Sequence, residues 1–251
     1  MKIPYFFILI ALTVISCQKD QKKAQTEIVT ISEIPEVTET EEQTTDEKVL
    51  HTDTIILSED KNADINLVLA NLVKQEADKD SVVTSTFRLD FYQNKNKIAS
   101  SKIAIQQYEK GSDWSGSLGL TESSNQNSSF ISIGSGYPAC GYTHENYLYY
   151  LKDSNLQLVH HWQSMSDSGW GMWTEFVNHD SEGGKDPKMF YCKTVAFVPG
   201  DDDNEDSGIL KYSDSISFSL QGSHWKKKLL SAKEKPYFEK KMTFNEFHNQ
   251  Q

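Results

Sequence analysis

The clearest candidates for chemistry are three tryptophans near the middle of the chain. Trp170 lies between two glycines in the stretch SDSGWGMWTEF, Trp173 follows in the same stretch, and Trp162 lies just upstream. Exposed indole rings stack on apolar ligand faces and anchor partners at protein interfaces. We therefore expect a ligand-contacting aromatic platform around Trp170. The alternative is that Trp162 and Trp173 fill a core, which leaves Trp170 as the exposed ring.

The second candidate is an acidic loop with the sequence PGDDDNEDSG. Asp202, Asn204 and Asp206 offer oxygen ligands at alternate positions, the donor type that calcium prefers. An EF-hand loop starting at Asp202 would carry glycine at its sixth position and an acidic residue at its twelfth, where this chain has Ser207 and Ser213. The loop is therefore a weak calcium candidate, and a solvated acidic loop is the alternative.

The histidines predict no metal site. His160 and His161 are adjacent, and neighbouring side chains on a strand point to opposite faces, so the two cannot easily bind one ion. No spacing resembles HExxH or a Cys/His zinc module. We expect neither a metal nor a cofactor.

No catalytic set is recognisable from residue spacing. The chain lacks GxSxG, a phosphate-binding P-loop and GxGxxG. These absences favour a non-enzymatic protein. The alternative is a hydrolase whose site assembles from residues distant in sequence, drawn from His144, Glu145, His160, Asp180 and His224.

Two cysteines in the body of the chain leave a redox question open. Cys140 lies in the turn-like YPACGY and Cys192 in the strand-like MFYCKT. In an oxidising compartment an even pair predicts a disulfide. The alternative is a pair of buried free thiols that act as small apolar side chains.

The amino-terminal segment MKIPYFFILIALTVIS has the pattern of a secretory signal peptide. Lys2 is followed by an apolar run that ends at Ser16 and Cys17. As a helix, the run from residue 3 to 15 would extend roughly 20 Å, which is short of the ~30 Å hydrocarbon core of a bilayer. A membrane-spanning helix is therefore not expected.

The residues at the end of this run resemble a known signal. Val14-Ile15-Ser16-Cys17 resembles the lipobox of bacterial lipoproteins. The resemblance implies that residues 1–16 are removed, that the Cys17 thiol carries a diacylglycerol, and that a palmitate-type chain acylates the new amino terminus. Gln18-Lys19-Asp20 resembles the start of the export signal of surface lipoproteins in Bacteroidota-type bacteria, with Gln21 where a second acidic residue is expected. We expect an outer-membrane anchor, with the periplasmic and surface faces both open.

Residues 17–48 predict a lipidated, disordered tether. The segment is rich in Glu, Thr and Lys, and it has no aromatic residue. Such a segment cannot bury enough apolar surface to offset its conformational entropy. Residues 49–251 then form a single β-rich domain of ample size for one core.

Net charge excludes one class of partner. The chain carries a formal charge of −11, and general nucleic-acid binding requires a cationic face. The distribution is uneven, because an acidic cluster at 201–206 precedes a lysine-rich stretch at 226–241. Plain solvated surface is the expected role of both.

Alternating apolar and polar residues predict a mainly β fold. The segment VVTSTFRLDFYQNKNKIASSKIAIQQY predicts a hairpin that turns at Gln93–Asn96, and ENYLYYLKDSNLQLVHHW predicts a second that turns at Asp153–Asn155. In NADINLVLANLVKQEA, at 62–77, the apolar residues recur with helical spacing and predict one amino-terminal helix packed on the sheet. We expect an antiparallel β-sandwich or barrel-like sheet, with a small propeller as the alternative.

These features together predict a membrane-anchored lipoprotein of the cell envelope with a non-enzymatic binding or interaction domain. The expected partners are the membrane, through Cys17, and a glycan or another envelope protein. The alternatives are an envelope hydrolase and a structural subunit of an envelope complex.

Overall fold

The computed structural model describes residues 47–60, 63–120, 128–178, 186–200 and 206–250. Cys17, the lipobox and nearly all of the expected tether lie outside these ranges, as do Asp202 and Asn204. None of the helices in the described ranges is long and apolar enough to cross a membrane.

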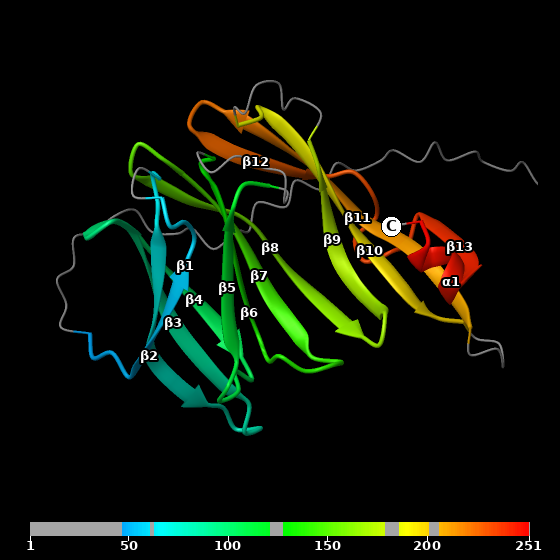
Figure 1. The fold of residues 1–251 in the computed structure, drawn as a ribbon, viewed down its shortest axis with the longest axis horizontal. Helices are drawn as coiled ribbons and strands as arrows, with labels where there is room; N and C mark the ends of the chain where they lie inside the picture. The colour runs from blue at the N-terminus through cyan, green and yellow to red at the C-terminus, as the bar shows by residue number, and fades with distance from the viewer. Residues whose placement is uncertain (1–46, 61–62, 121–127, 179–185, 201–205, 251) are drawn as a thin grey trace, which may run out of the picture.

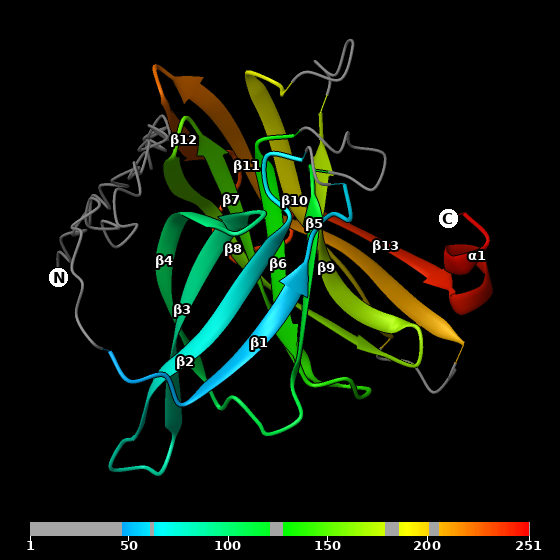
Figure 2. The ribbon, with the colours of Figure 1, turned by 60° about the vertical axis from the view of Figure 1, so that its left-hand side comes forward.

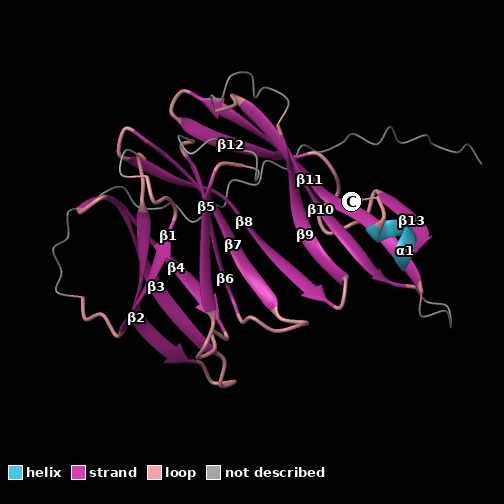
Figure 3. Cartoon of the chain, in the orientation of Figure 1, coloured by secondary structure: helices cyan, strands magenta, loops and turns pink. Residues whose placement is uncertain are grey.

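The described chain is almost entirely antiparallel β-structure, as the sequence predicts (Figure 3). The first sheet has the order β1-β2-β3-β4, formed by β1 (His51–Ile56), β2 (Leu67–Ala77), β3 (Val83–Gln93) and β4 (Asn96–Gln106). The second sheet starts with β5 (Asp113–Leu118), β6 (Phe130–Gly136), β7 (Thr143–Lys152) and β8 (Asn155–Asp167). It continues with β9 (Trp170–Val177), β10 (Met189–Pro199), β11 (Ser207–Gln221) and β12 (His224–Leu229). Strand β13 (Phe238–Thr243) pairs with the first half of β11, and β12 pairs with the second half. Helix α1 (Phe244–His248) follows β13.

The strands stack in three layers. Figures 1 and 2 show the first sheet on one side, β5–β8 in the middle, and β9–β11 with β13 and α1 on the other side. The second sheet curls, so that β12 returns to β8, where Trp225 and Gln157 exchange two hydrogen bonds of 2.7 and 2.9 Å. The sheet order keeps β5 and β12 as ends, so the arrangement is a layered sandwich and not a set of propeller blades.

The middle layer is buried on both faces. Along β7, Tyr147, Tyr149 and Leu151 face the core shared with the first sheet. Leu148 and Tyr150 alternate with them and face a second core, which β10, β11 and β12 complete. Successive side chains of a strand point to opposite faces, so a run of five apolar residues is what a strand between two cores requires.

The predicted helix at 62–77 is wrong, because residues 67–77 form the interior strand β2. Val68, Ala70 and Leu72 are buried at alternate positions, and β2 pairs with β1 on one side and with β3 on the other. Apolar residues at 68, 69, 72 and 73 fit a helical period. The hydrogen bonds to two neighbouring strands and the β-preferring valines decide for a strand.

Both predicted hairpins are confirmed. Strands β3 and β4 join through a turn that places Asn94 at φ 56°, and Asp153 and Ser154 take φ 50° and 62° between β7 and β8. Positive φ at both central residues, as at Asp153 and Ser154, matches the right-handed twist of paired strands, whereas the β3–β4 turn has it at Asn94 alone of its two central residues.

Candidate functional site

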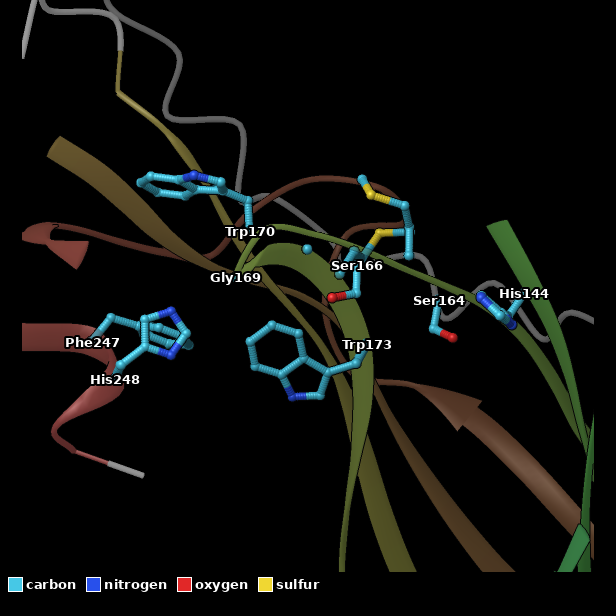
Figure 4. Close-up of a pocket in the computed structure, with 11 residues that line it drawn as sticks. His144, Ser164, Ser166, Gly169, Trp170, Trp173, Phe247 and His248 are labelled. Carbon is cyan, nitrogen blue, oxygen red and sulfur yellow. The ribbon is translucent and has the colours of Figure 1, made fainter. Parts of the chain in front are cut away.

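A groove of about 410 Å³ lies where β7, β8, β9 and α1 approach one another. We call it the aromatic groove, and it is lined by His144, Ser164, Met165, Ser166, Gly169, Trp170, Gly171, Met172, Trp173, Phe247 and His248. Figure 4 shows Phe247 and His248 on one side, the two tryptophans beside them, and Ser164 and His144 toward the other side. Its size falls within the range of small-ligand pockets.

Trp170 is held by a stack of aromatic rings. Its indole stacks on Phe197 with centroids 4.6 Å apart, and Phe197 stacks on Phe247 at 4.1 Å. A side chain at Gly208 would fill this space, since a Cβ there would lie 2.7 Å from Trp170 Cζ3 and 2.4 Å from Phe197. Glycine at 208 therefore lets the strand pass beneath the stack.

Trp173 reaches the groove from the same strand. Its ring centroid lies 5.9 Å from that of Phe247, and its Nε1 donates a hydrogen bond of 3.4 Å to Glu175 Oε1. Both tryptophans are half-buried and belong to the same cluster as Val195 and Phe197. Each tryptophan therefore packs against the core with one part of its ring and lines the groove with another.

Helix α1 closes one side of the groove, and its start is fixed by a capping box. The Thr243 hydroxyl accepts a hydrogen bond from the Glu246 amide, and the Glu246 carboxylate accepts one from the Thr243 amide. This reciprocal pair satisfies two amides that a helix start leaves unpaired. The cap aims Phe247 into the cluster beneath and sets His248 at the groove.

The opposite side of the groove is polar and is formed by serine and histidine side chains. The Asn146 amide donates a hydrogen bond of 3.0 Å to Ser164 Oγ, which leaves the hydroxyl proton of Ser164 free to donate in turn. His144 lies over Gly136, where a Cβ would come within 2.0 Å of the imidazole. The lining contains no Asp, Glu, Lys or Arg.

The structure brings Trp170 and Trp173 together and keeps Trp162 apart. Trp162 is half-buried in the second core, where it stacks on His160 at 5.5 Å and contacts Phe176 at 5.1 Å. Sequence reasoning did not assign His144, Ser164, Phe247 or His248 to a site with the tryptophans. The motif Thr243-x-x-Glu246 before Phe247 was the one local signal that could have located the helix.

The two cysteines of the body are free thiols and form no disulfide, and the alternative of a buried thiol holds for Cys192 but not for Cys140. Cys140 is exposed and Cys192 is buried. Cys192 Sγ lies 3.9 Å from His160 Nε2. Burial raises the pKa of Cys192 to about 12, and burial, with Lys227 nearby, lowers the pKa of His160 to about 3. Both side chains are therefore neutral at pH 7, which is opposite to the thiolate–imidazolium pair of a cysteine nucleophile.

Of the other residues considered for catalysis or metal binding, the described structure places His144 alone at the groove, and Asp180 lies outside the described residues. Glu145 bonds to His161 and to Gln163, and these hydrogen bonds hold the pKa of Glu145 below its usual range. His144 lines the groove, whereas His224 is exposed at the start of β12. Of the calcium candidates only Asp206 lies in the described ranges, and no cluster of His, Cys, Asp and Glu there could hold a metal ion.

No family model, curated protein or solved structure matches this chain. The groove must therefore be interpreted from its own geometry.

Gly169 is expected to be essential for the position of α1. It has φ +90°, and a Cβ there would lie 2.5 Å from Phe244 Cζ and 3.0 Å from His248 Nε2. Gly222 is a matched control, because it has φ +64° with nothing within 4 Å of its Cβ position. Each alanine substitution should cost about 1–2 kcal/mol for the left-handed backbone. Gly169→Ala should cost more in denaturant unfolding and should speed hydrogen exchange of the Phe247 amide. Equal losses in the two variants would contradict this role.

His160 should make the protein less stable in acid. Its folded pKa of about 3 lies below the ordinary value of 6.5, so the unfolded chain binds the extra proton first as pH falls. The stabilising effect is complete above about pH 6.5 and is lost progressively down to about pH 3. His160→Phe, among the rings of Trp162 and Phe218, should reduce the drop in unfolding free energy across this window. His224→Gln, at an exposed histidine, is the control and should keep the wild-type drop.

Proposed function

We propose that this protein is a lipid-anchored binding protein of the cell envelope, and that the aromatic groove binds an uncharged glycan. The observation that carries the proposal is the lining of the groove, where two tryptophan rings face serine and histidine side chains without any ionic group. A sugar ring presents an apolar face to an indole and hydroxyls to neighbouring polar groups. The groove offers both kinds of contact within one small space.

The lack of ionic groups in the lining favours a neutral ligand over a charged one. A buried charge without a partner is costly, so a site for phosphate, carboxylate or ammonium groups normally supplies an opposite charge. The chain as a whole carries −11, and yet Glu175, which accepts a hydrogen bond from the groove residue Trp173, is paired with Lys193 at 3.1 Å. A second envelope protein inserting an apolar side chain is the alternative occupant.

The anchor is supported by sequence alone. The lipobox-like residues 14–17 and the polar segment after them would leave the described domain on about thirty residues of chain. Two or more acyl chains make membrane attachment durable, since each buried CH₂ contributes about 0.8 kcal/mol. The protein would then hold its groove close to an outer-membrane face without spanning the bilayer.

Titration with a panel of neutral polysaccharides tests the ligand. At least one polysaccharide should change the tryptophan fluorescence of the wild-type protein, and the change should saturate as the polysaccharide concentration rises. Trp173→Ala and Trp170→Ala should each weaken that binding at least about tenfold, the scale expected for an aromatic anchor. Tyr237→Ala removes an exposed ring outside the groove and should leave affinity unchanged.

Unfolding of the tryptophan variants should be measured alongside, because Trp170 also packs on Phe197. Trp170→Phe keeps a ring on that stack, so this variant should retain the fold and bind the ligand with lower affinity. The glycan assignment is wrong if no member of a broad panel binds the wild-type protein, or if both alanine variants bind as the wild type does.

Metabolic labelling with a fatty-acid probe tests the anchor. The wild-type chain should carry the label and fractionate with the outer membrane. Cys17→Ala should lose the label and should accumulate with residues 1–16 still attached, because lipid transfer to the cysteine precedes cleavage in the lipoproteins that the lipobox resembles. An unlabelled wild-type chain would refute the anchor without bearing on the groove.

A further inference from the structure

Exposed apolar side chains gather on one face of the third layer, which is formed by β9–β13. Of the nine large apolar residues with the greatest exposure in the described ranges, five lie there: Val177, Met189, Leu230, Tyr237 and Phe238, at 37–52% exposure. We call this surface the outer face. It is the side of β9–β12 that points away from the second core, because Phe190, Phe218 and Trp225 fill that core from alternate positions.

The strand registers place these residues on a common face. Tyr191 pairs with Val177 on one side and with Ser217 on the other, and Ser217 pairs with Lys228. The next row runs from Met189 through Ser219 to Lys226. Small serines in the centre of these rows leave the flanking apolar and basic side chains standing above the sheet.

A further row of aromatic rings continues the outer face toward β13. Phe238 stacks on Tyr212 at 4.8 Å, and Tyr237 lies 6.5 Å from the same ring. Lys193 Nζ lies 3.9 Å above the Tyr212 ring and pairs with Glu175. Leu230, whose amide donates a hydrogen bond to the Ser215 carbonyl, follows Lys228 by two residues, and alternation places it on the same side of the chain as Lys228.

Lysines border the apolar residues and are largely uncompensated. In the described part of the chain no carboxylate lies within 4.0 Å of Lys226, Lys228 or Lys235, while Glu234 pairs with Lys233. The stretch 224–241 contains seven lysines and two glutamates, a net charge of +5 in a chain of −11. The remainder of the protein is therefore strongly acidic and carries the opposite sign.

We propose that the outer face docks on an anionic phospholipid surface. Aromatic and aliphatic side chains enter the boundary between head groups and acyl chains, while lysines bind the lipid phosphates with their stems along the apolar surface. The acidic remainder is repelled by the same phosphates, which orients the domain with this face toward the bilayer. A second copy of the chain fits less well, because a symmetric contact would oppose lysine to lysine.

Part of this surface has a purely structural explanation. Charged side chains on edge strands protect against unwanted sheet pairing, and β12 and β13 are edge strands. That role explains lysines at an edge. It does not explain five exposed apolar side chains on the same face, since such patches on soluble proteins mark interaction surfaces.

Vesicle sedimentation tests the proposal on residues 17–251 carrying Cys17→Ala and produced without residues 1–16, so that neither a lipid anchor nor the apolar signal segment contributes. The protein should sediment with vesicles of mixed phosphatidylglycerol and phosphatidylcholine and stay in solution with phosphatidylcholine alone. Raising the salt from about 0.1 M to about 0.5 M should release it, because exposed charges are then screened. Each lysine near an anionic surface should strengthen partitioning roughly fivefold.

Paired substitutions separate this face from the overall charge. Lys226→Gln with Lys228→Gln should weaken partitioning roughly twenty-five-fold. Lys79→Gln with Lys95→Gln makes the same charge change at exposed turns of the first sheet and should have little effect. Leu230→Ser should weaken partitioning and leave its salt dependence in place. Absence of binding to the anionic vesicles, equal binding to both kinds, or equal loss in the two lysine pairs would overturn the proposal.

Discussion

Burial of β7 on both faces is the constraint on which the rest of the structure depends. The run Tyr147–Leu151 is apolar at every position, so neither face of the strand can meet water. The first sheet covers one face, and the Tyr149 hydroxyl donates to Ser101 Oγ at 3.3 Å, which satisfies the polar end of that ring. The other face requires a further layer, and the curl of the second sheet, closed at Gln157 and Trp225, supplies it.

The third layer has only one face committed to this core, and its second face gives rise to both proposed surfaces. At the end near Phe197, α1 covers the sheet, and the aromatic groove forms where the helix meets β8 and β9. Beyond the bulge in β11, between Ser213 and Ile216, no helix of the described ranges covers the sheet, and the apolar and basic residues of the outer face are exposed there. One short capped helix thus separates a groove from an open face.

Sequence reasoning succeeded where a signal is local and failed where it is not. Turn residues and alternation predicted the hairpins at Asn94 and Asp153, because both properties belong to a few consecutive residues. The segment 67–77 fits two periods at once, and pairing with β1 and β3, which no local pattern encodes, selected the strand. The same distinction holds in the site: Trp170 and Trp173 are close in sequence, whereas His144 and Phe247 reach them only through the fold.

The division of charge follows from the same layering. The second core contains Cys192, with His160 beside it and Lys227 half-buried at its border. Burial lowers the pKa of Lys227 and keeps the Cys192 thiol and the His160 imidazole neutral. An environment that disfavours charge this strongly is unsuited to nucleophilic chemistry. Where a charge is buried elsewhere it has a partner, as Asp90 of the first sheet has in Arg88 at 3.1 Å. The lining of the aromatic groove contains no Asp, Glu, Lys or Arg, so ring stacking and hydrogen bonds are the contacts that it offers.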